Sequence, residues 1–76
     1  MSTLSKEHYS EHFYRCTYNS IYEGSTIKEL QVILSLYEEI EDYEACQGIN
    51  KALKELKVLT LSQFIEKIKL INGRFT

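Results

Sequence analysis

Proline is absent from this chain of 76 residues, and glycine occurs only three times, at Gly24, Gly48 and Gly73. Proline and glycine are the strongest breakers of helices, so their scarcity permits long uninterrupted helical segments. Good helix formers such as Leu, Glu and Lys are frequent throughout the chain. The composition therefore predicts an all-α fold.

The chain has only two cysteines, Cys16 and Cys46, which is too few for a disulfide framework. Both are expected on apolar helical faces, and we predict that they are buried structural thiols. The chain begins without an apolar leader, and no apolar run approaches the roughly 18 residues of a membrane span. These absences predict a cytoplasmic protein that makes no contact with a membrane.

The length predicts one domain, residues 1–76, with a small core. Domains of this size commonly need disulfides, a metal or self-association for stability. Because the sequence has no disulfide framework and no cofactor motif, we predict self-association as a homodimer or a higher homo-oligomer. Its surfaces would be the tyrosine-rich first helix, at about residues 5–22, and exposed apolar flanks of the helical hairpin at residues 26–58.

The formal net charge of −2 conceals a strong asymmetry between the two halves of the chain. Residues 1–45 carry nine acidic against three basic residues, whereas residues 46–76 carry six basic against two acidic residues. Charge complementarity within the fold or between subunits is one interpretation. The alternative is weak nucleic-acid binding, against which the scarcity of arginine and the absence of a recognition motif both argue. That alternative would use Lys51, Lys54, Lys57, Lys67, Lys69 and Arg74.

Capping signals divide the chain into four predicted helices, at about residues 5–22, 26–40, 42–57 and 61–72. Ser5 and Asp42 are suitable N-caps. Thr26 with Glu29, and Thr60 with Gln63, form capping boxes, although Ser62 is an alternative start for the last helix. The pair Asn72–Gly73 predicts a left-handed stop for that helix.

The stretch from residue 26 to 58 predicts an antiparallel helical hairpin at the centre of the fold. Its first helix is apolar around most of its circumference, which predicts that it is the central helix. Its second helix has one apolar seam, formed by Tyr43, Cys46, Ile49, Leu53 and Leu56. Gly48 inside that helix predicts a close approach by a neighbouring helix.

The first predicted helix has two apolar stripes and must therefore pack twice. Tyr9 and Phe13 lie on one stripe, and Tyr14, Tyr18 and Tyr22 lie on the other. Either the second stripe contacts another molecule, for which tyrosine is well suited, or both stripes close over the hairpin within one chain. On the first alternative, the candidate partner-binding anchors are Tyr14, Tyr18 and Tyr22.

Five acids lie within residues 38–44, at the predicted reversal between the hairpin helices. Their spacing lacks the alternation and the glycine of a calcium loop, so we expect a solvated turn and no metal. An exposed acidic turn would steer a protein partner. The candidate partner-binding residues here are Glu38, Glu39, Glu41, Asp42 and Glu44.

His8, His12 and Cys16 are spaced four residues apart, so they stack on one helical face. Residues 8–12 also have the H-x-x-E-H pattern of inverted zinc proteases. A straight helix cannot bring all three side chains to one ion, and a chain this short has no room for a substrate cleft. We therefore predict neither a metal site nor an enzyme.

The second hairpin helix resembles the UVR motif of bacterial excision-repair proteins, which pairs two antiparallel helices. The resemblance rests on an aromatic-Glu start, a small residue and spaced aliphatic residues. It departs from the motif at Gln47 and at Asn50–Lys51. It implies a hairpin that mediates protein–protein contact. The residues that carry it are Tyr43, Glu44, Cys46, Ile49, Leu53 and Leu56.

These observations predict a small non-catalytic protein–protein interaction module without a cofactor. A regulator or inhibitor of a larger host system, encoded by a bacteriophage or a mobile element, is a setting that fits its size; its location would then be the host cytoplasm. Two alternatives remain open: an oligomer that binds or sequesters a nucleotide-like small molecule, and the weak nucleic-acid binding described above.

Overall fold

The computed structural model describes residues 6–73 of the chain, with side chains from His8 onward. It contains four α-helices, α1 (Lys6–Tyr22), α2 (Ile27–Glu39), α3 (Tyr43–Leu56) and α4 (Leu61–Asn72). Within these residues there is no strand, so the all-α, four-helix prediction is confirmed. The predicted cap Ser5 lies outside the described residues.

The capping boxes predicted for α2 and α4 are both present. The amide of Glu29 donates to the Thr26 hydroxyl over 3.1 Å, and the Thr26 amide donates to the Glu29 carboxylate over 2.8 Å. Thr60 and Gln63 make the same reciprocal pair at 3.2 and 3.0 Å, so the N-cap of α4 is Thr60 and not Ser62. These bonds satisfy helix N–H groups that have no partner within the helix.

Glycine ends one helix as expected and another differently. Gly24 follows α1 with a φ of 118°, a left-handed conformation that suits glycine. Gly73 has a φ of −64°, so the predicted left-handed stop at the end of α4 is wrong. In the α2–α3 turn the left-handed position is taken by Glu41, whose φ is 60°.

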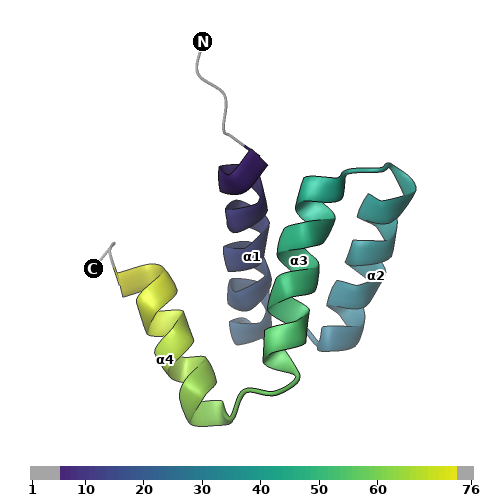
Figure 1. Ribbon diagram of the computed structural model, residues 1–76. Coiled ribbons are helices and arrows are strands. Elements are labelled where there is room, and N and C mark those ends of the chain that lie inside the picture. The colour runs from purple at the N-terminus through teal and green to yellow at the C-terminus, as the bar shows by residue number, and fades with distance from the viewer. Residues whose placement is uncertain (1–5, 74–76) are drawn as a thin grey trace.

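The central helix is α3, and the prediction that the first hairpin helix is central is wrong. The most extensive contacts in the fold join α3 to α1, and α3 also packs against α2. Figure 1 shows α1 and α3 running in the same direction, with α2 antiparallel to α3 at the edge of the molecule. The outer side of α2 therefore faces away from the other helices.

Small residues on α3 explain why α1 packs against it so closely. Ala45, Gly48 and Ala52 are all buried, and they recur at helical spacing along one side of α3. A Cβ atom at Gly48 would meet the carbonyl oxygen of Ser10 and would lie 2.9 Å from the amide nitrogen of Tyr14. The close approach predicted at Gly48 is thus present, and the approaching helix is α1.

Two apolar clusters form the core, and α3 contributes to both. One joins α1, α3 and α4 through buried residues that include Tyr18, Ala52 and Ile68. The other joins α1, α2 and α3 around Leu30, Ile49 and Leu53. The two stripes of α1 therefore both pack within the chain, which was one of the two alternatives for this helix.

Several residues predicted to be internal are exposed instead. Tyr43, assigned to the apolar seam of α3, is exposed, and so is Leu61 at the start of α4. Cys16 is exposed and Cys46 is half-buried, so the prediction of two buried thiols is also wrong. Among the residues that the structure describes, no helix is long and apolar enough to cross a bilayer.

Candidate functional site

Two of the three tyrosines predicted as partner anchors lie inside the fold. Tyr18 is 0% exposed and Tyr14 is also buried, whereas Tyr22 is 58% exposed. The hydroxyls of Tyr14 and Tyr18 donate hydrogen bonds to the same oxygen, Oε1 of Glu55, over 2.6 and 2.7 Å. The buried pair therefore binds a carboxylate of its own chain, and at most 7% of either residue is exposed.

Glu55 is the acceptor of a four-residue group that we name the Glu55 cluster: Tyr14, Tyr18, Glu55 and Lys67. Lys67 extends from α4 and places its Nζ 3.7 Å from the same Glu55 oxygen. Desolvation opposes ionisation of Glu55, but the tyrosine hydrogen bonds and the lysine charges together lower the pKa of its carboxyl. The cluster thus stabilises a carboxylate anion where α1, α3 and α4 meet.

The tyrosines of this cluster are held in their neutral form. Burial and the hydrogen bond to the Glu55 carboxylate raise the pKa of both Tyr14 and Tyr18. A phenol that donates to a carboxylate and resists ionisation has no role as a general base at neutral pH. The constellation accordingly supports a structural function for these two hydroxyls.

The acidic turn, defined as Glu38, Glu39, Glu41, Asp42 and Glu44, has an exposed part and an engaged part. Asp42 caps α3 by accepting from the Ala45 amide over 3.4 Å, and it also accepts from the Tyr9 hydroxyl over 2.9 Å. This hydrogen bond, together with burial, raises the pKa of Tyr9. Glu38, Glu39 and Glu41 are exposed. The turn therefore offers three carboxylates to solvent while Asp42 is engaged in the fold.

Asp42 is the member of the acidic turn on which stability depends. We expect Asp42→Ala to lower the free energy of unfolding by about 1 kcal/mol, because α3 loses its N-cap. Asp42→Asn should retain most of the stability, since an asparagine side chain also caps well. Urea denaturation of both variants checks this, and an Asp42→Ala midpoint equal to that of the unmodified protein would contradict it.

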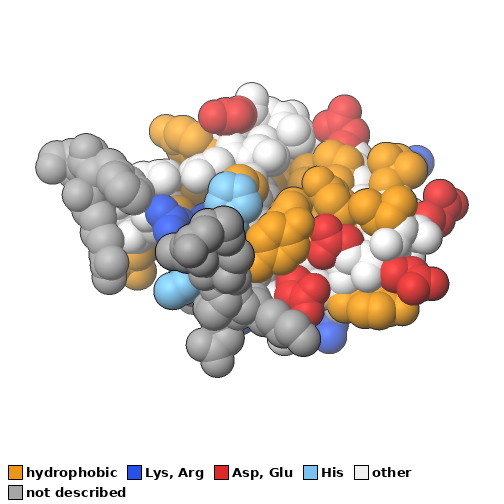
Figure 2. Space-filling view, turned by 90° about the horizontal axis from the view of Figure 1, so that it is seen from above, with side chains coloured by type: hydrophobic (Ala, Val, Ile, Leu, Met, Phe, Trp, Pro, Cys, Tyr) orange, Lys and Arg blue, Asp and Glu red, His pale blue; other side chains and the backbone are white. Residues whose placement is uncertain are grey.

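An apolar surface lies on the outer side of α2. It consists of Val32, Ile33 and Leu36 on the helix and Ile40 at its C-cap, which we name together the apolar α2 face; they are between 39% and 69% exposed. The opposite side of α2 packs against the core through residues that include Leu30. Figure 2 views the molecule from the end that carries the acidic turn, and there hydrophobic side chains alternate with carboxylates on the side where α2 lies.

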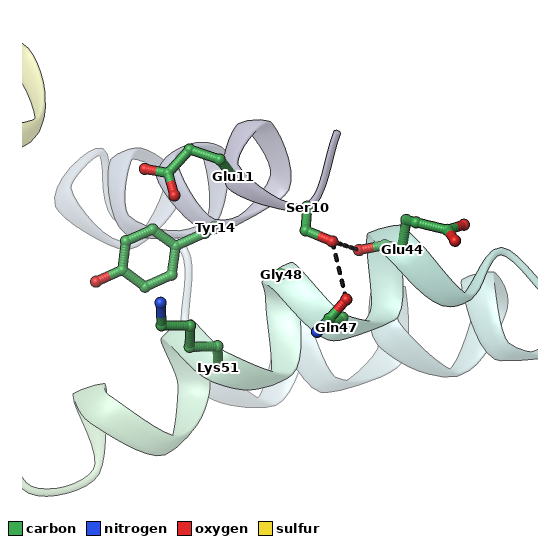
Figure 3. A pocket seen from close by; sticks show the side chains of 7 residues that line it. All are labelled: Ser10, Glu11, Tyr14, Glu44, Gln47, Gly48 and Lys51. Atoms are coloured by element: carbon green, nitrogen blue, oxygen red, sulfur yellow. Dashed lines mark hydrogen bonds between the residues drawn. The ribbon is translucent and has the colours of Figure 1, made fainter. Parts of the chain in front are cut away.

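A hollow of about 320 Å³ lies between α1 and α3, near the point where Gly48 lets the helices approach. Figure 3 shows Ser10 at one end, donating to the Glu44 carbonyl over 3.0 Å and to Gln47 over 3.1 Å. At the other end the Lys51 amine lies 4.9 Å from the centre of the Tyr14 ring. The amine lies over this ring face and would have to move before a nucleotide base could stack there.

His12 and Cys16 lie close together on the surface of α1. The Cys16 sulfur lies 3.5 Å from Nε2 of His12, and both side chains are exposed. Within the described part of the chain, no three His, Cys, Asp or Glu side chains converge as metal ligands. The zinc-protease pattern of residues 8–12 thus has no third ligand among these residues.

The lysines proposed for the nucleic-acid alternative differ in their surroundings. Lys67 pairs with Glu55, and Lys51 lies over the Tyr14 ring. Lys54 is exposed on α3, Lys57 is exposed at the C-cap of α3, and Lys69 is exposed on α4. Arg74 lies outside the described residues. Two of the six basic side chains are therefore engaged within the fold.

No protein-family model matches the chain, and no curated protein or solved structure matches it either. The antiparallel pairing of α2 and α3, which the resemblance to the UVR motif implies, is visible in Figure 1. The assignment of function therefore depends on the geometry of the chain itself.

Sequence reasoning missed one feature of the core and left one feature of the surface unassigned. Glu55 was counted only as an acid within the basic half of the chain, although it lies on α3 among apolar residues that form the core. Exposed apolar flanks of the hairpin were predicted as a self-association surface, but the residues of the apolar α2 face were not assigned to them, because a helix that is apolar on most sides was taken to be buried on most sides. Separating its residues into an inner and an outer set would have required knowledge of the number of neighbouring helices.

Proposed function

We propose that this protein is a small non-catalytic module that binds another protein and self-associates. The observation that carries the proposal is the apolar α2 face, where four aliphatic side chains lie exposed along one side of a helix. Contiguous exposed apolar surface on a small protein commonly marks an interaction site. The polar groups of the Glu55 cluster, by contrast, form hydrogen bonds and an ion pair with one another inside the fold.

The acidic turn adjoins the C-terminal end of the apolar α2 face. Glu38, Glu39 and Glu41 supply exposed negative charge there, and Tyr43 supplies an exposed aromatic ring. An apolar centre with a charged border is the usual anatomy of a protein interface. The charge accelerates encounter with a basic partner, while the apolar side chains retain it.

Tyr22 does not belong to this surface. It lies at the C-terminal end of α1, at the opposite end of the molecule from the acidic turn (Figure 1), and its ring centre is 6.5 Å from that of Phe64. The proposed partner-binding set is therefore the exposed acids with Tyr43 and the apolar α2 face. Its biological setting, in our proposal, is the cytoplasm, where the protein regulates or inhibits a larger host system on behalf of a bacteriophage or mobile element.

The exposed acids give the proposal a kinetic test. Changing Glu38, Glu39 and Glu41 together to Gln, while leaving Asp42 intact, is expected to slow association with the partner about tenfold at low salt. The difference should shrink as salt is added, because screening weakens attraction between exposed charges. The partner is first captured from the native host, and association rates are then measured by surface plasmon resonance.

The matched control is a variant with Glu11, Glu23 and Glu66 changed to Gln, which removes the same number of exposed acids elsewhere. The control should associate at nearly the unmodified rate. Equal slowing by both variants would show that only net charge matters. Capture that survives Leu36→Glu and the triple acidic variant would overturn the proposed surface.

A further inference from the structure

The apolar and charged side chains on the outer side of α2 are arranged so that this side is complementary to the same side of a second, antiparallel copy. At 100° per residue, Val32, Ile33, Leu36 and Ile40 fall within an arc of about 100°. Lys28 and Glu39 both lie beside Val32 on the same flank of this arc, eleven positions apart in the sequence. That spacing corresponds to roughly 16 Å along the helix. One basic and one acidic side chain thus border the same edge of the apolar α2 face, near its opposite ends.

Lys28 and Glu39 are available for contacts outside the chain. Both are exposed, and neither takes part in an ion pair within the described residues. Glu29, the other acid near the N-terminal end of α2, is turned back into the capping box with Thr26. The charged flank therefore carries a free lysine at one end and a free glutamate at the other.

We propose that the apolar α2 face binds the same face of a second copy of this chain, with the two α2 helices antiparallel about a two-fold axis. A two-fold axis that lies in the interface and is perpendicular to α2 reverses the helix direction in the second copy. It also places the charged flanks of the two copies on the same side of the interface. With the axis near Leu34, Lys28 of each copy lies beside Glu39 of the other, and Val32 packs against Leu36. A parallel two-fold arrangement would instead place the charged flanks of the two copies on opposite sides of the interface, so that Lys28 and Glu39 would not meet.

The macrodipoles of the two helices favour the same arrangement. Antiparallel packing sets the positive N-terminal end of each α2 beside the negative C-terminal end of the other. The exposed Glu38, Glu39 and Glu41 of each copy then lie at opposite ends of the pair and do not face their equivalents. Charge complementarity thus selects a second copy in one orientation.

The size of the face sets the expected strength of the dimer. Covering the apolar α2 face and its flanks on both copies would bury on the order of 1,000 Å² in total, the lower limit of specific interfaces. We therefore expect a reversible dimer with a Kd in the micromolar range. This inference rests on the proposed interaction function and names the occupant of its apolar part.

The first test is the molar mass in solution, measured by light scattering at about 100 µM, well above the Kd expected for an interface of this size. The unmodified protein is expected to approach twice its chain mass of 8.9 kDa. Leu36→Glu should reduce it to the monomer mass, whereas the control Leu61→Glu, at an exposed residue on α4, should leave the dimer intact. A monomer mass for the unmodified protein would overturn the inference.

The second test distinguishes the antiparallel geometry from other self-contacts. Lys28→Glu and Glu39→Lys each place two like-charged pairs in the dimer, so each variant alone should dimerise about tenfold more weakly. An equimolar mixture of the two variants restores both opposite-charge pairs and should dimerise as the unmodified protein does. A mixture no stronger than its components would overturn the proposed orientation.

These outcomes are separable from failure of the proposed function. If the chain is monomeric but Leu36→Glu abolishes capture of a partner, then the apolar α2 face binds that partner and the second copy is excluded. If the chain dimerises as described but neither Leu36→Glu nor the triple acidic variant affects partner capture, then the inference stands and the partner-binding surface is refuted.

Discussion

Gly48→Ala is expected to lower the free energy of unfolding by about 2 kcal/mol, although alanine is the better helix former by about 1 kcal/mol. The added methyl would meet the Ser10 carbonyl oxygen and approach the Phe13 Cβ at 3.0 Å. Ser10, Phe13 and Tyr14 belong to α1, and two of the three nearest atoms are backbone, so α1 must move away from α3 as a unit. Steric cost should therefore exceed the gain in helix propensity.

Urea denaturation followed by circular dichroism measures this change. Gly73→Ala is the matched control, because nothing lies within 4 Å of a Cβ at that position and its φ of −64° is helical. The control should be neutral or slightly stabilising. A Gly48→Ala variant as stable as the Gly73→Ala control would show that the α1–α3 contact is looser than the structure indicates.

Loss of the Glu55 carboxylate is expected to be the second large effect. Glu55→Ala should lower the free energy of unfolding by about 2–3 kcal/mol, because two tyrosine hydroxyls lose a charged acceptor at once. The Tyr18 side chain is fully buried, so its hydroxyl cannot turn to bulk water without opening the cluster. Thermal or urea unfolding measures the effect, with Glu66→Gln on the exposed side of α4 as the control.

The Glu55 cluster also predicts the direction of two pH effects. The pKa of Glu55 is lowered in the fold, so its stabilising contribution is present above the ordinary glutamate pKa and is lost as pH falls through the folded value. The pKa values of Tyr14 and Tyr18 are raised, so their contribution is present below pH 10 and is lost as pH rises above it. Stability should therefore decline at both extremes.

Variants separate these two limbs of the pH profile. Glu55→Gln is expected to flatten the acid limb, because a neutral amide does not titrate. Tyr14→Phe with Tyr18→Phe is expected to flatten the alkaline limb. Unfolding free energies measured from pH 3 to pH 11 check both, and an acid limb unchanged by Glu55→Gln would contradict the role given to this carboxylate.

The helices were predictable because their signals are local. Thr26 with Glu29, and Thr60 with Gln63, mark helix starts within three residues of sequence, and the structure contains both capping boxes. The central helix was not predictable in this way. Hydrophobic content favoured α2, but the central place belongs to α3, whose buried alanines and Gly48 contribute little hydrophobic surface while allowing α1 to approach.

The candidate site was less predictable because it depends on pairings across the chain. Tyr18 and Glu55 are separated by 37 positions, and no spacing rule connects a tyrosine on one helix with a carboxylate on another. The sequence therefore suggested that the tyrosines of α1 form a binding surface, whereas Tyr14 and Tyr18 are buried in the fold. The acidic turn was easier to locate, since five carboxylates in seven residues resist burial wherever the chain places them.

The place of α3 between the two apolar clusters couples the two sides of the fold. Leu56 packs against both clusters, Ala52 belongs to one, and Ile49 belongs to the other. Each cluster therefore depends on side chains of the same helix. A change that shifts α3 against one cluster is expected to alter its packing against the other.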